Sequence, residues 1–143
     1  MPPLTRWFLK TAIVCLLAAL LLSLLLALNP MVELPLFVSY LSPVYFHLFL
    51  VGWVTQMIFG VIYWMFPIIT RAKPRGNAYL GWTTYLLLNV GLLLRVIGEP
   101  LVGIFPQSGW GRLLPLSAFM QWLAGVLFIW LAWPRVKARY RGE

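Results

Sequence analysis

Four long apolar stretches alternate with short polar segments along this chain. They cover approximately residues 11–28, 44–69, 79–98 and 113–133. Each stretch is about as long as the roughly 20 residues that a helix needs to cross the hydrocarbon core of a membrane. The pattern therefore predicts an all-α fold, an integral membrane four-helix bundle that forms a single transmembrane domain over residues 1–143.

Residues typical of helix ends flank the first two stretches. Asn29-Pro30 closes the first, and Ser42 followed by Pro43 predicts a helix start with Ser42 as the N-cap. A basic segment before an apolar run is also typical of a signal peptide. Residues 11–28 exceed the roughly 7–15 residues of a signal core, so we favour a first membrane span.

The charges orient these spans. The chain is 62% hydrophobic and only 10% charged, and its net charge is +8. With both chain ends on one side, only Arg95 and Arg112 lie on the other. The remaining cations are Arg6, Lys10, Arg71, Lys73, Arg75, Arg135, Lys137, Arg139 and Arg141. Because cytoplasmic loops carry the excess of Lys and Arg, we expect both termini in the cytoplasm and a multi-pass protein of the cell inner membrane.

The positions of the Lys and Arg residues also indicate which partners to expect. These basic residues flank apolar spans, so the positive charge indicates a lipid bilayer and no nucleic acid as the partner. The cations after Pro134 are interpreted mainly as a topology anchor, with contact to anionic headgroups as the alternative. Cys15 is the only cysteine, which excludes an internal disulfide and a multi-cysteine metal site.

The second span carries a regular stripe of small and polar residues. Gly52, Gln56 and Gly60 recur every four residues and share one helix face, roughly opposite His47. Glycines let a neighbouring helix approach closely, and Gln56 can hydrogen-bond across that contact. We therefore expect this face to pack against another helix.

Each of the last three spans holds one amide side chain at intermediate depth: Gln56, Asn89 and Gln121. We expect these amides to meet as a structural hydrogen-bond cluster, which is favoured over a proton path. A proton pump or small multidrug transporter would show a carboxylate in mid-membrane, whereas all three acidic residues lie outside the deep region.

His47 and Arg95 are the candidate site residues. The second span runs inward and the third outward, which places both side chains about one turn below the outer surface. A neutral imidazole can bind iron and a guanidinium can pair with propionates, so together they favour haem b as a cofactor. The structural alternatives are a hydrogen bond from His47 to a neighbouring helix, and an Arg95 that snorkels or pairs with Glu99.

A second axial ligand must come from elsewhere, because His47 is the only histidine. Met120 on the fourth span is the internal candidate. A histidine from another copy or another subunit is the external one. The haem hypothesis therefore predicts a homo-oligomer or a subunit of a larger membrane complex.

The segment HLFLVGWVTQMIFGVIYWMFP, His47 to Pro67, resembles the second helix of haem-copper oxidase subunit I and its nitric oxide reductase relatives. The next run, GWTTYLLLNVGLLLR, Gly81 to Arg95, resembles the following helix of short subunit I-like membrane proteins. In that family an early histidine on this helix binds the low-spin haem, which implies His47 as the metal ligand. The further histidines of the oxidases are missing, so the resemblance implies no oxygen reduction by this chain.

Three functions follow from these features. The leading one is haem b binding through His47 for electron transfer or for redox or gas sensing. The second is a haem-free accessory or assembly subunit of a respiratory membrane complex, which docks through its glycine face and its apolar outer loop. A small channel or transporter is disfavoured by the missing deep carboxylate. Independent catalytic activity is not expected, because no catalytic triad, metal cluster or phosphate loop stands out.

Overall fold

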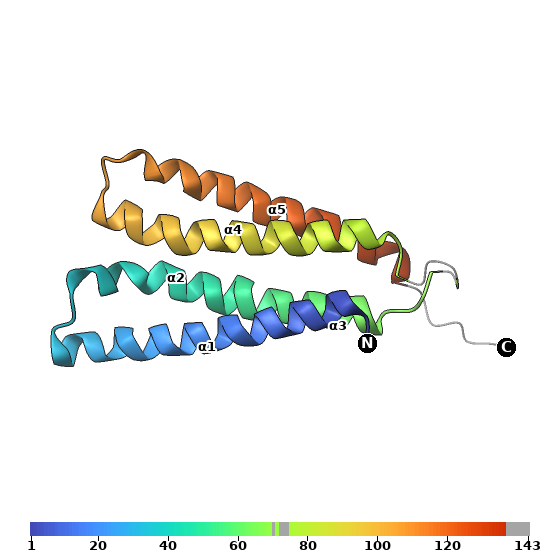
Figure 1. Ribbon diagram of the computed structural model, residues 1–143, viewed down its shortest axis with the longest axis horizontal. Helices are drawn as coiled ribbons and strands as arrows, with labels where there is room; N and C mark the ends of the chain where they lie inside the picture. Colours follow the sequence, from blue (N-terminus) through green and yellow to red (C-terminus); the bar gives the residue numbers. More distant parts are fainter. Residues whose placement is uncertain (70, 72–74, 137–143) are drawn as a thin grey trace.

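The computed structural model describes residues 1–69, 71 and 75–136 of the chain. Within these residues, four helical segments are long and apolar enough to cross a membrane. The segments are Pro3–Val32, Leu36–Met65, Ala78–Ile104 and Gly109–Arg135. They form two antiparallel hairpins that lie side by side (Figure 1), which confirms the predicted all-α membrane four-helix bundle. Of the cations used to orient the spans, Lys73, Lys137, Arg139 and Arg141 lie outside the described residues, as does Thr70.

The first hairpin begins with α1 (Pro3–Val32), which is longer than the span predicted over residues 11–28. The helix runs through Pro30 and ends where Glu33 adopts a left-handed backbone with φ 50°. Proline removes the hydrogen bond to the carbonyl of residue 26, but Pro30 lies only two residues before the last helical residue, so the helix is nearly complete before the bond is lost. Asn29-Pro30 therefore does not end the helix.

The second span is a continuous run of four helical segments of three types. It comprises η1 (Leu36–Leu41, 3₁₀), α2 (Ser42–His47), η2 (Leu48–Thr55, π-helical) and α3 (Gln56–Met65). Ser42 lies inside this run with helical φ −56° and ψ −46°, and its side chain makes no capping bond. The prediction that Ser42 caps a new helix is wrong, because the preceding 3₁₀ turns already satisfy the backbone.

Pro67 sets the end of the second span. A residue before proline is driven out of the helical region, and Phe66 is accordingly extended, with ψ 148°. The helix therefore stops at Met65, and the predicted boundary at residue 69 is four residues too long.

The second hairpin pairs α4 (Ala78–Ile104) with α5 (Leu113–Ala132) through the 3₁₀ turn η3 (Gly109–Arg112). The side chain of Asn77 caps α4 by accepting a hydrogen bond from the Tyr79 amide. The helix continues past the predicted end at residue 98, so Glu99 is a helical residue one turn beyond Arg95. A last 3₁₀ turn, η4 (Trp133–Arg135), follows α5.

The glycine and glutamine stripe packs on α1, as predicted. A Cβ added to Gly52 would lie 2.8 Å from the Cys15 Cβ, and one added to Gly60 would lie 3.0 Å from the Phe8 Cβ. Gln56 is fully buried between these two glycines. The close approach of α1 therefore depends on the absence of side chains at these two positions.

Contacts between the two hairpins run mainly through α4. This helix lies against α5 along its length and also contacts η1, α2, η2 and α1. Among the described elements, α5 reaches the first hairpin only through α3, and it makes no close backbone approach to α2 or η2. α5 consequently does not cover α2, the segment that carries His47.

Candidate functional site

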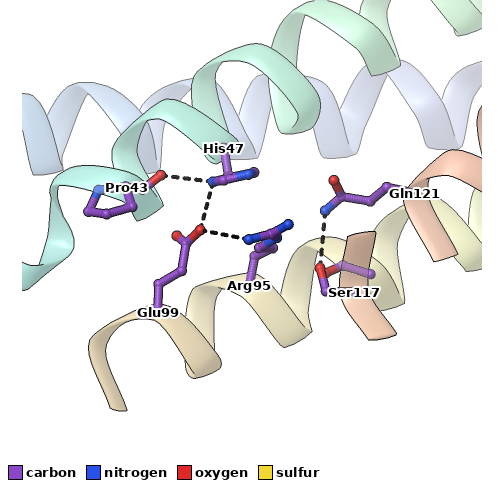
Figure 2. A network of polar contacts seen from close by, with 7 residues as sticks. Pro43, His47, Arg95, Glu99, Ser117 and Gln121 are labelled. Carbon is purple, nitrogen blue, oxygen red and sulfur yellow. Dashed lines mark hydrogen bonds and ion pairs between the residues drawn. The ribbon is translucent and has the colours of Figure 1, made fainter. Parts of the chain in front are cut away.

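His47 is the last residue of α2 and points across to α4 (Figure 2). Its Nδ1 lies 2.9 Å from Glu99 Oε1 and 3.0 Å from the backbone oxygen of Pro43. A backbone carbonyl can only accept a hydrogen bond, so the geometry requires the proton on Nδ1. This tautomer leaves the lone pair on Nε2, and Nε2 makes no hydrogen bond with any residue that the structure describes.

Glu99 links His47 to Arg95. Glu99 Oε1 lies 3.5 Å from Arg95 Nη1, one helical turn away on α4. Only 7% of the Glu99 side chain is exposed, against 20% for Arg95 and 28% for His47. With a neutral imidazole, the cluster holds one negative and one positive charge and is electrically balanced, which lowers the cost of burying it.

Two polar atoms of this cluster have no partner among the described residues. Glu99 Oε2 and Arg95 Nε are both buried and make no hydrogen bond. A buried acceptor and a buried donor without partners are costly, and they mark a place where water or a ligand group would be stabilised.

The arrangement around His47 matches that of a metal-binding histidine. Such residues donate the proton of one ring nitrogen to a carboxylate or a backbone carbonyl, which fixes the ring and leaves the other nitrogen free for the metal. Both kinds of acceptor lie beside Nδ1. Within the described residues, no group of three potential metal-ligating side chains occurs. The chain thus offers one oriented nitrogen ligand instead of a closed metal site.

The structure brings the predicted site residues, His47 and Arg95, into one cluster through Glu99. The contact of Glu99 with Arg95 is one of the alternatives expected from the sequence. Its contact with His47 was not predicted. The four-residue spacing from Arg95 signals the first contact. The second depends on the register between the two hairpins, which no local pattern reports. A cofactor role for His47 and Arg95 stays a prediction.

Met120 and Gln121 lie deeper in the bundle than this cluster. An added Cβ on Gly91 would touch both of them, and Gly91 is eight residues before Glu99, about 12 Å along α4. Met120 is therefore not level with His47. Gln121 donates to Ser117, whose hydroxyl donates in turn to the Gly91 carbonyl at 2.6 Å, so Gln121 belongs to the α4–α5 contact.

The predicted amide cluster forms in part. Gln56 and Asn89 exchange two hydrogen bonds of 3.1 and 3.2 Å, and the Thr11 hydroxyl lies 2.8 Å from Gln56 Oε1. These bonds join α1, α3 and α4 across both hairpins. Because the two amides satisfy each other's donors and acceptors, the network is structural, in agreement with the interpretation from sequence.

Comparison of the chain with protein-family models, with curated proteins and with solved structures gave no match. The function must accordingly be argued from the geometry of the His47 cluster.

Proposed function

We propose that this multi-pass membrane protein binds haem b through His47 Nε2 and serves in electron transfer or in redox or gas sensing. The observation that carries the proposal is the fixed tautomer of His47. Its Nδ1 proton is directed at Glu99 and Pro43, so that Nε2 is left with a free lone pair on a partly exposed ring. The resemblance of residues 47–67 to the oxidase helix supports the same assignment.

Each chain would supply one nitrogen ligand, so a second histidine would have to come from another copy or another subunit. Two copies related by a two-fold axis would present their His47 rings to the same haem, and an interface of this kind is self-complementary. The His47 side chain is 28% exposed, and α5 does not contact α2. The exposed edge of the imidazole is where we place the contact between copies.

The residues around the ring have separate roles in this proposal. Bound haem would supply a reversible one-electron couple. Glu99 holds the Nδ1 proton, fixes the orientation of the imidazole and increases the basicity of Nε2. Arg95 neutralises Glu99. It can also pair with a propionate, but only by sharing its guanidinium between two carboxylates.

Absorption spectroscopy tests this proposal. Protein purified from haem-replete cells should show a Soret band and a sharp reduced α band, with one haem for every two chains. His47→Ala should abolish both bands. Phe46→Ala removes the neighbouring ring, which is 56% exposed, and should leave the bands unchanged. A colourless wild-type preparation, or bands that survive in His47→Ala, would contradict haem binding.

One observation favours the haem-free accessory subunit as a second candidate. The His47–Glu99 bond joins the two hairpins near the end formed by η1 and η3, so His47 has a structural role without any cofactor. At that end Leu36 and Phe37 of η1 are 73% and 47% exposed, and they offer an apolar surface to a partner subunit. A colourless protein that co-purifies with a respiratory complex would support this candidate.

A further inference from the structure

A buried arginine lies at the opposite end of the bundle, far from His47. Arg135 of η4 is only 1% exposed, and it reaches the end of α3 in the other hairpin. Its Nε donates to the Pro67 carbonyl at 3.1 Å, and its Nη2 donates to the carbonyls of Tyr63 and Phe66 at 3.1 and 2.7 Å. These are the carbonyls that α3 leaves without partners where it ends.

The positive charge of Arg135 has no described counter-ion. Its three hydrogen bonds go to neutral carbonyls, and Nη1 bonds to none of the described residues. The carboxylates in the described part of the chain are Glu33, which follows the last residue of α1, and Glu99, near the end of α4, and both lie at the other end of the bundle. A buried guanidinium without an anion is costly, so this end of the bundle favours the binding of one.

A second arginine makes the binding of an anion at this end more favourable. Arg75 directly precedes Gly76, which lines the same hollow as Pro134, the residue before Arg135. The Arg75 charge therefore acts on both Arg135 and Tyr63. Its Nε is buried and has no hydrogen-bond partner in the described structure. Two like charges that share a partly buried site repel each other unless an anion lies between them or beside them.

Hollows adjoin these arginines. A cavity of about 190 Å³ is lined by Phe66, Pro67, Arg135 and Val136. It has several times the roughly 30 Å³ that one water molecule occupies, so it has room for a phosphate group. An apolar groove of about 620 Å³ runs along α5 and η4 as far as Pro134, the residue before Arg135, and is lined by Val126, Ile129, Trp130, Trp133 and Pro134. A third hollow shares Trp130 and Pro134 with the groove and extends to Gly76, next to Arg75.

We propose that Arg135 and Arg75 bind the phosphate of an anionic phospholipid whose acyl chain lies in the groove along α5. Charge complementarity selects the headgroup, and a wall of tryptophans and aliphatic residues at membrane depth fits the chain. The site goes beyond the proposed function and is independent of it, because it lies at the other end of the bundle and uses none of the residues around His47.

Thermal unfolding of the delipidated full-length protein tests the site. Phosphatidylglycerol added to neutral detergent should raise the unfolding temperature more than phosphatidylcholine does. Arg75→Gln should weaken the apparent affinity for phosphatidylglycerol by about fivefold, since one cation near a membrane surface contributes about 1 kcal/mol. Arg135→Lys keeps the charge but loses the forked donors, and it should weaken binding as well.

Arg6→Gln is the matched control, because it removes one exposed cation from the same end of the bundle without touching the groove. It should leave the affinity unchanged. Equal stabilisation by the two lipids, or an equal loss in Arg6→Gln and Arg75→Gln, would overturn the site. Inorganic phosphate in neutral detergent should protect little. Protection by phosphate as strong as that by the lipid would overturn the role of the acyl chain.

Discussion

One carboxylate oxygen, Glu99 Oε1, serves both a histidine and an arginine. It lies 2.9 Å from His47 Nδ1 and 3.5 Å from Arg95 Nη1. The shorter distance crosses between the hairpins, whereas the longer one stays within α4. Glu99 therefore contributes more to holding the hairpins together than to pairing Arg95. Water or lipid headgroups can partly replace Glu99 as the partner of Arg95.

We expect Glu99→Gln to lower the free energy of unfolding by roughly 1.5–3 kcal/mol, the range for hydrogen bonds to charged groups. The amide can still accept the Nδ1 proton, but Arg95 would lose its counter-ion. Denaturant titration in detergent, followed by circular dichroism, measures the change. Glu33→Gln removes the same charge from an exposed residue and should have little effect. Equal losses in the two variants would show that the cluster does not stabilise the bundle.

At the scale of the helix, the π-helical segment η2 contacts both α1 and α4. Its wider turn begins directly after His47 and contains Gly52, where an added Cβ would lie 2.8 Å from the Cys15 Cβ of α1. π-Helical turns are often found beside functional sites. Here η2 connects α2, which ends at His47, with α3, which carries the rest of the packing stripe.

Gly52→Ala should destabilise the protein by about 1–3 kcal/mol, because overpacking forces neighbouring groups to shift. The new Cβ would lie 2.8 Å from the Cys15 Cβ and 3.0 Å from a Leu92 methyl carbon. Gly125→Ala is the control, since no heavy atom lies within 4 Å of its added Cβ. The control should be neutral or slightly stabilising, because alanine favours helix. If Gly52→Ala unfolded no more easily than the control, the packing of α1 on the second span would be misassigned.

The sequence was sufficient for the number and order of the four helices, because each apolar run is long enough to cross a membrane. It did not give their ends, since α1 and α4 extend beyond the predicted spans. It also predicted the face that packs on α1, since the glycine spacing is a local signal. It failed at Ser42, where a 3₁₀ entry replaced a capped start. It also failed at the end of α4, because the turn residues after Gly98 indicated a loop. The contact of His47 with Glu99 could not be predicted from the sequence, because it depends on the register between two separate hairpins.

At the scale of the whole molecule, the two hairpins place the N-terminus and Arg135 at the same end of the bundle (Figure 1). The described cations at that end include Arg6, Lys10 and Arg75, whereas Arg112 lies at the other end in η3. The positive-inside rule therefore still predicts that the end with the N-terminus faces the cytoplasm.

Cysteine labelling in intact cells tests this orientation. In a Cys15→Ala background, Gln107→Cys should react with a membrane-impermeant maleimide added outside. Ala78→Cys, at the opposite end, should react only after the membrane is permeabilised. Both positions are exposed on the protein surface, so accessibility to the reagent depends on the side of the membrane. The reverse pattern would show that the termini face outward.

The bonds from Arg135 to the end of α3 also have a consequence for biogenesis. The ribosome completes the second span about 70 residues before it reaches Arg135. The carbonyls of Tyr63, Phe66 and Pro67 therefore lack the Arg135 donor while two further spans are inserted. A nascent chain that stops short of η4 has all four apolar segments and still lacks the contact that closes the bundle. The hydrogen bonds between η4 and the end of α3 can therefore form only after the last helical turn of the bundle has been synthesised.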